Sequence, residues 1–179
     1  VLDLVEIPFG RSLLQGCLQH LQGFLLVADG AFQVCQPNNS VEIVRFDVLQ
    51  DIVPALRAAF PDIEIVFRAD TGFAMPEIYE YLEAENLKNV IGYATNAKLV
   101  RETILLQNYV AALASMYDEP CCRFPEIRGY QADSWDRSRR IIAKCEVTAS
   151  GGPNRRFVVT NLSDAPSQVY HGCYVQRGH

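Results

Sequence analysis

The chain has 179 residues, which suits one domain or a domain with an insertion. Hydrophobic residues make up 49% and charged residues 21%, so the composition predicts a packed core and argues against wholesale disorder. No apolar run reaches the roughly 18 residues of a membrane-spanning helix, no secretory signal is visible, and the net charge of −5 argues against a simple basic nucleic-acid binder.

The charge is unevenly distributed along the chain. Residues 1–119 hold 7 Lys/Arg against 16 Asp/Glu, whereas residues 120–179 hold 9 against 5. An acidic body with a basic tail fits an acidic metal site beside a phosphate-binding surface, and it also fits ordinary variation in a soluble protein. The six cysteines include no Cys-x-x-Cys pair, so we expect reduced thiols in a cytoplasmic protein and no zinc site.

The first part of the chain predicts a hairpin, a helix and a buried strand. Asp29-Gly30 between two apolar runs predicts a β-hairpin over residues 24–36, because both turn positions favour positive φ. Apolar residues recur at helical spacing over residues 41–60, where Pro54 predicts a kink or a break between two helices. β-Branched and aromatic residues predict a strand over residues 63–68.

The rest of the chain alternates further and then becomes rich in strands. Pro76 predicts the start of a helix that ends near Asn86, and a strand over residues 89–94 and a long helix over about 97–116 follow. Beyond Pro120 we expect three strand segments, around residues 123–130, 140–148 and 156–161. A turn over residues 150–154 separates the last two, and a final helix is expected over residues 165–177. This order predicts an α/β fold with a β-rich insertion or appendage.

Asp70 follows the predicted strand over residues 63–68 directly. Ligands of open α/β sheets usually bind at the carboxyl ends of the strands, and a carboxylate there is a hard oxygen ligand suited to magnesium. One carboxylate binds a cation weakly, and Asp3 and Glu6, in a segment that could form a neighbouring strand, are its candidate partners. The alternative is that Asp70 only caps the turn or helix after it.

Several long motifs follow one another in a recognisable order. They are Ile65-Val-Phe-Arg-Ala-Asp-Thr-Gly-Phe-Ala with Pro76-Glu-Ile-Tyr, Val90-Ile-Gly-Tyr-Ala-Thr-Asn-Ala, Tyr130-Gln-Ala-Asp-Ser-Trp-Asp-Arg-Ser-Arg-Arg with Ala143-Lys, Asn154-Arg-Arg-Phe-Val-Val-Thr-Asn-Leu, and Tyr174-Val-Gln-Arg-Gly. In this order they resemble the DDE domain group 1 family of bacterial insertion-sequence transposases. The resemblance covers nearly the whole chain from Phe24 onward.

The resemblance implies an α/β fold of the ribonuclease H-like type, a mixed sheet with flanking helices and a β-rich insertion. Residues 1–119 would be a partial catalytic core, 120–165 the insertion and 166–179 the start of a returning core helix. Three acids would hold two Mg²⁺ (or Mn²⁺) ions for DNA cleavage and strand transfer by in-line displacement at phosphorus. The implied partner is DNA, both transposon ends and target, near the bacterial nucleoid, and a homodimer is expected because transposases commonly act as dimers on paired ends.

The resemblance also assigns residues. Asp70 matches the second acid of the triad, and Tyr174 and Arg177 match a Tyr-x-x-Arg-x-x-x-Glu motif in which the arginine would grip a DNA phosphate. Alternatively, Tyr174 is a packed aromatic and Arg177 a solvated charge.

A second set of candidate DNA contacts lies in the predicted insertion. Trp135, the only tryptophan, stands near Arg128 and close to Arg137, Arg139 and Arg140. Proteins that hold unpaired bases stack them on aromatic rings beside cationic groups, so these side chains are predicted to contact DNA. The alternative is that Trp135 packs the insertion against the core.

Two departures from the family pattern bear on activity. Family members usually begin this domain with Leu-Asp-x-Asp-x-Thr, but Val5 stands at the position of the presumed first acid, and Asp3, on the same strand face, is the better substitute than Glu6. The expected third acid falls two residues past His179. We therefore expect this polypeptide to be inactive alone, the alternatives being a DNA-binding remnant without catalysis and a folded remnant with no role.

Overall fold

The computed structural model describes residues 24–25, 33–34, 42–61, 64–149 and 151–175. The chain divides into two compact units, residues 1–66 and residues 67–179, and each is described by itself.

In the first unit, β1 (Phe24–Leu25) pairs with β2 (Gln33–Val34). The pairing is antiparallel, which confirms the predicted hairpin pairing, with Leu25 opposite Gln33. A two-residue turn at Asp29-Gly30 would instead place Leu25 opposite Val34, so the register differs by one residue from that prediction. The turn residues themselves lie outside the described residues.

Among the described residues of the same unit, α2 (Glu42–Ala59) is a long helix that runs through Pro54. The predicted alternative of a break between two helices is therefore wrong. Proline removes one backbone hydrogen bond from a helix, and the burial of Leu49 and Val53 offsets that loss.

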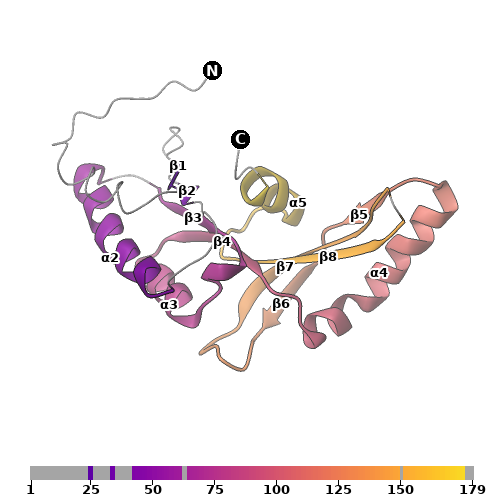
Figure 1. The fold of residues 1–179 in the computed structure, drawn as a ribbon, viewed down its shortest axis with the longest axis horizontal. Coiled ribbons are helices and arrows are strands. Elements are labelled where there is room, and N and C mark those ends of the chain that lie inside the picture. The colour runs from indigo at the N-terminus through magenta and orange to yellow at the C-terminus, as the bar shows by residue number, and fades with distance from the viewer. Residues whose placement is uncertain (1–23, 26–32, 35–41, 62–63, 150, 176–179) are drawn as a thin grey trace, which may run out of the picture. The chain divides into compact units, whose positions relative to one another are not determined.

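The second unit is built on a six-stranded sheet (Figure 1). The strands in sheet order are β3 (Val66–Ala69), β4 (Lys88–Tyr93), β8 (Pro153–Thr160), β7 (Arg139–Val147) and β5 (Cys121–Arg123), and β6 (Glu126–Tyr130) pairs with β7. β8 is antiparallel to both β4 and β7, so that Thr160 lies opposite Val90 on one side and Arg140 on the other. The β-rich segment after Pro120 therefore continues the same sheet as β3 and β4.

Polar side chains reinforce the junction between β4 and β8. Asn161 donates from Nδ2 to the carbonyl of Leu87 at 2.8 Å and accepts at Oδ1 from the backbone N–H of Asn89 at 2.8 Å. The Thr160 hydroxyl donates to the Asn89 carbonyl at 2.7 Å. Thr160 and Asn161, in the motif that begins at Asn154, thus stabilise this junction.

The helices of this unit agree with the predicted ones within a few residues. Helix α3 (Pro76–Ala84) has proline in its first turn, and α4 (Ala97–Tyr117) is capped by Asn96, whose side chain accepts from the N–H of Leu99. The short α5 (Pro166–Gln168) continues into the π-helical turn η2 (Val169–Tyr174). Among the described residues, no helix is both long enough and apolar enough to cross a membrane.

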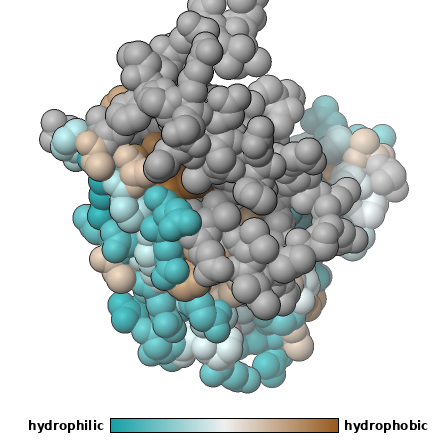
Figure 2. Space-filling model, turned by 60° about the vertical axis from the view of Figure 1, so that its left-hand side comes forward, coloured by the Kyte–Doolittle hydropathy of each residue, from teal (hydrophilic) through white to brown (hydrophobic). Residues whose placement is uncertain are grey.

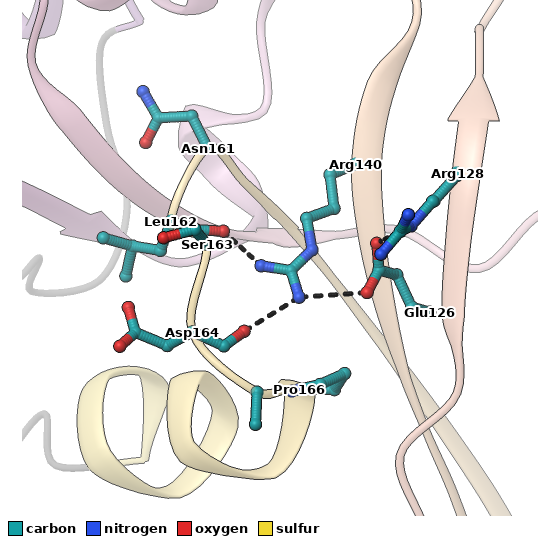
Figure 3. Close-up of a pocket in the computed structure, with 9 residues that line it drawn as sticks. Glu126, Arg128, Arg140, Asn161, Leu162, Ser163, Asp164 and Pro166 are labelled. Carbon is teal, nitrogen blue, oxygen red and sulfur yellow. Dashed lines mark hydrogen bonds and ion pairs between the residues drawn. The ribbon is translucent and has the colours of Figure 1, made fainter.

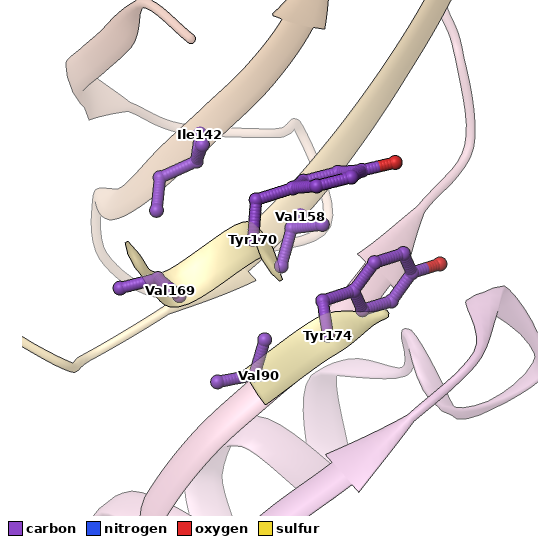
Figure 4. Packing of buried hydrophobic residues seen from close by; sticks show 6 residues of the cluster. All are labelled: Val90, Ile142, Val158, Val169, Tyr170 and Tyr174. Carbon is purple, nitrogen blue, oxygen red and sulfur yellow. The ribbon is translucent and has the colours of Figure 1, made fainter. Parts of the chain in front are cut away.

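Helices pack on both faces of the sheet (Figure 1). On one face, α5 and η2 cover a core of six buried residues, Val90, Ile142, Val158, Val169, Tyr170 and Tyr174 (Figure 4). On the other face, α4 contacts β7, and buried Gln107 donates to the carbonyl of Glu146 at 3.0 Å. Because Asp70 follows β3, the first strand in the sheet order, it lies at one edge of this sheet.

Candidate active site

Asp70 lies one residue beyond β3, at the carboxyl end of the strand. Its Oδ1 accepts a hydrogen bond from the N–H of Gly72 at 2.9 Å, so Asp70 caps the short 3₁₀ turn η1 (Thr71–Phe73). One oxygen of the Asp70 carboxylate therefore has the capping role that the alternative interpretation predicted. The side chain is partly exposed, and Oδ2 remains a hard oxygen ligand for a cation.

Tyr174 and Gly92 approach the same strand end from two other elements. A Cβ built on Gly92, in β4, would lie 2.6 Å from the Tyr174 hydroxyl, 3.1 Å from the Thr71 nitrogen and 3.3 Å from the Asp70 carbonyl carbon. An added Cβ would force the Tyr174 hydroxyl and the Thr71 backbone to shift, so this approach favours glycine. Residues that are more than a hundred positions apart in the chain, Asp70 and Tyr174, therefore converge on Gly92.

A buried arginine ties η2 to β3 beside this point. Arg68 is nearly inaccessible and donates from a guanidinium nitrogen to the carbonyl of Cys173. Burial raises the pKa of the Cys173 thiol, and the charge of Arg68 acts in the opposite direction. The turn that carries Tyr174 is thus anchored to the strand that carries Asp70. The sequence patterns did not mark Arg68 or Gly92 for a role, although a glycine inside a predicted strand can signal a close approach.

The described residues supply one carboxylate to a metal site. Within them, no group of three or more His, Cys, Asp or Glu side chains is placed to hold a metal ion. Asp3 and Arg177, the other two residues predicted at this site, lie outside the described residues. Asp70 can thus serve as one carboxylate ligand of a divalent cation, which would need further oxygen ligands.

Trp135 lies in an aromatic cluster and is only 5% exposed. Its ring is 5.4 Å from Tyr79 of α3, 5.1 Å from Tyr93 of β4 and 5.7 Å from Tyr130 of β6, measured between centroids. Burial raises the pKa of Tyr79, and burial together with Tyr130 raises that of Tyr93 to about 12. In this arrangement Trp135 packs the segment after β6 onto α3 and β4, and a stacked base would have to displace these rings.

Arg139 lies against the same aromatic cluster and is also buried. Its guanidinium donates to both carboxylate oxygens of Glu83 at 2.6 and 3.0 Å and to Asp136 at 3.1 Å. The guanidinium carbon lies 5.0 and 5.1 Å from the ring centroids of Tyr79 and Trp135. A DNA phosphate at Arg139 would have to replace these partners, whereas neighbouring Arg137 is 63% exposed.

Arg140 lines an open pocket of about 520 Å³ between the end of β8 and β6 (Figure 3). It donates to Glu126 at 3.1 Å, to the carbonyl of Asp164 at 2.9 Å and to that of Leu162. Hydrogen bonds from Arg128 and Arg140 lower the pKa of Glu126. Arg140 therefore holds the connection from β8 to α5, and Arg128, at 85% exposure, is the accessible cation of the pocket.

Comparison with known protein families matches residues 35–179 to the family of transposase DDE domain group 1. The matched region includes the convergence point of Asp70, Gly92 and Tyr174. Neither the curated proteins nor the solved structures contain a match.

Proposed function

Because the chain belongs to the transposase DDE domain group 1 family, we propose that it is the ribonuclease H-like DNA cleavage and strand-transfer domain of an insertion sequence, with Asp70 as a metal-holding acid. One observation supports this most: the second-acid motif and the Tyr-x-x-Arg motif, far apart in the sequence, meet at Gly92. The carboxyl end of β3 is also where ligands of open α/β sheets bind.

In this proposal Asp70 and Asp3 together hold a divalent cation, Mg²⁺ or Mn²⁺. The bound cation would supply charge compensation at the phosphorus centre. The N–H of Gly72 fixes one oxygen of Asp70 and so orients the carboxylate. Tyr174 positions the start of the C-terminal helix against the strand end, and Arg177, further along the same motif, grips a DNA phosphate.

We further propose that Val5 leaves the site short of a metal ligand, since a valine side chain cannot bind a cation. The Val5→Asp variant should bind Mn²⁺ at least about tenfold more tightly than the unchanged protein, because it adds a further carboxylate to those of Asp70 and Asp3. Isothermal titration calorimetry measures this difference. Asp70→Asn in the Val5→Asp background should remove the gain. Asp118→Asn is the matched control, because this exposed aspartate precedes β5, at the opposite end of the sheet order from β3. Retention of the gain without Asp70 would contradict the proposal.

A second candidate function, DNA binding without catalysis, is favoured by the exposed Arg128 and Arg137 in the basic part of the chain, residues 120–179. Such binding neutralises phosphates and should weaken steeply with salt, while EDTA leaves it unchanged. Fluorescence anisotropy with a labelled DNA duplex measures both dependences for the protein as it stands. If EDTA abolishes binding, DNA is held through the metal and the non-catalytic module is excluded. If no duplex binds at low salt, both DNA functions are contradicted.

A further inference from the structure

Arg68 is a charged side chain in the interior of the second unit. Hydrophilic residues ordinarily lie at the surface, and they make up most of the visible described residues on the face drawn in Figure 2. Arg68, by contrast, is 1% exposed. Burying a guanidinium is costly, and an apolar side chain of similar volume at such a position is often neutral or stabilising. Stability alone therefore does not account for an arginine here.

The buried guanidinium of Arg68 contacts the C-terminal turn. It donates to the carbonyl of Cys173, near the end of η2. Asp70 has an extended backbone, with φ −83° and ψ −173°. Side chains two positions apart on an extended strand point to the same face. Arg68 and Asp70 therefore lie on that face of the strand end to which η2 is tied.

This hydrogen bond adds direction to the packing of η2 on the sheet. Val169, Tyr170 and Tyr174 pack on apolar side chains of β4, β7 and β8 (Figure 4). Apolar contacts of this kind are non-directional. A hydrogen bond to one carbonyl depends on both distance and angle, so it specifies the rotation of the turn more narrowly. Arg68 supplies it from the strand that leads to Asp70.

We propose, on the basis of the proposed function, that Arg68 is a positioning residue for the C-terminal part of the site. It holds η2 in the rotation at which Arg177, three residues beyond Tyr174 in the sequence, reaches a DNA phosphate. Arg68 itself is too deeply buried to touch DNA, and it acts through the backbone of Cys173. Buried charged groups that specify one arrangement of a fold are known from other proteins.

A double-mutant cycle on DNA affinity tests this role. Fluorescence anisotropy with a labelled duplex at low salt measures the affinity of the full chain. Arg177→Gln should weaken binding about tenfold in the otherwise unchanged protein, the effect of losing a hydrogen bond to a charged group. In the Arg68→Met background the same change should weaken binding less than about twofold. The charge lost with Arg68 lowers the affinity of both proteins in that background, so it cancels in the cycle.

Two further backgrounds separate positioning from the loss of any buried arginine. Arg68→Lys keeps a charge and a donor, and Arg177→Gln should again weaken binding at least about threefold in that background. Arg139→Met is the matched control, because it removes another buried arginine whose partners, Glu83 and Asp136, lie outside η2. There the effect of Arg177→Gln should remain about tenfold. An equal effect in the unchanged and Arg68→Met proteins would overturn the positioning role and leave the DNA function standing.

Hydrogen exchange of the protein without DNA or metal gives an independent readout. The N–H of Val175 lies 2.9 Å from the carbonyl of Tyr170 and closes η2, whereas the N–H of Ala143 is bonded in the buried part of the sheet. Arg68→Met should speed exchange at Val175 about tenfold more than at Ala143, because η2 loses its anchor while the sheet keeps its own bonds. Arg139→Met should show no such difference.

The two measurements distinguish failure of this role from failure of the proposed function. If Arg177→Gln leaves DNA affinity unchanged in the unaltered protein, the phosphate grip is contradicted, and the exchange at Val175 decides the role of Arg68. Exchange at Val175 that Arg68→Met does not selectively speed would overturn that role. Circular dichroism establishes that each variant folds. Arg68→Gln, which is polar but too short to reach the same carbonyl, replaces the methionine variant if the latter does not fold.

Discussion

Replacing Arg139 with methionine is expected to lower the free energy of unfolding by about 3 kcal/mol. The guanidinium is buried and donates to Glu83 and Asp136, and it lies against the rings of Tyr79 and Trp135. Methionine fills much of the space but leaves the Glu83 carboxylate beside an apolar cluster without its bidentate partner. Breaking a buried ion pair usually costs about 3–5 kcal/mol of stability. We expect the lower end of this range because Glu83 retains some exposure to water. Urea unfolding measures the change.

The neighbouring Arg137 provides the matched control for Arg139. It also pairs with Asp136, at 2.7 Å, and with Glu83, at 3.6 Å, but its side chain is mostly exposed. Arg137→Met should therefore cost much less than Arg139→Met, because exposed ion pairs contribute little to stability. Glu83→Gln added to Arg139→Met should recover part of the loss, since it removes a partly buried carboxylate that keeps only the 3.6 Å contact with Arg137. Equal losses for the two arginine variants would contradict the buried role of Arg139.

Replacing Gly92 with alanine should destabilise the protein by about 1–3 kcal/mol and displace Tyr174 from the end of β3. The added Cβ would lie 2.6 Å from the Tyr174 hydroxyl and 3.1 Å from the Thr71 nitrogen. The backbone atom cannot move without shifting the capped turn at Asp70. Thermal unfolding measures the stability, and proton-detected NMR of the tyrosine rings reports the displacement.

Two further variants separate this clash from a general effect of losing glycine. Gly172 lies in η2, and a Cβ added there would meet no atom within 4 Å, so Gly172→Ala should be neutral or mildly stabilising. Adding Tyr174→Phe to Gly92→Ala removes the nearest atom and should restore part of the lost stability. If Gly92→Ala lowers stability no more than Gly172→Ala does, the close approach of Asp70 and Tyr174 to Gly92 at the end of β3 is contradicted.

The sequence predicted the elements whose signals are local. Pro76 and Asn96 mark the starts of α3 and α4 because both satisfy the first turn of a helix. The β-branched runs after Pro120 predicted β7 and β8, and the position of Asp70 after β3 followed from strand and turn residues alone. Helical spacing predicted α2, but the break considered at Pro54 was wrong because the burial of apolar residues outweighs a local helix-breaking signal.

Contacts between distant segments could not be read from local patterns. The approach of Tyr174 to Gly92 depends on η2 folding back over the sheet, and the partner of Arg139, Glu83, comes from a helix 56 positions earlier in the chain. The basic run near Trp135 predicted a DNA surface, but burial and ion pairing distinguish Arg139 from exposed Arg137 only in three dimensions. Charge in a sequence does not state whether a side chain has a partner.

The location of a bound cation tests the proposed metal site most directly. Crystals of the Val5→Asp variant grown with Mn²⁺ should give an anomalous-difference peak about 2.1 Å from the Asp70 carboxylate, the distance usual for small divalent cations with oxygen ligands. A second ligand should come from the segment that contains Asp3. A peak elsewhere, or the same peak in crystals that also carry Asp70→Asn, would contradict the assignment of Asp70 as a metal-holding acid.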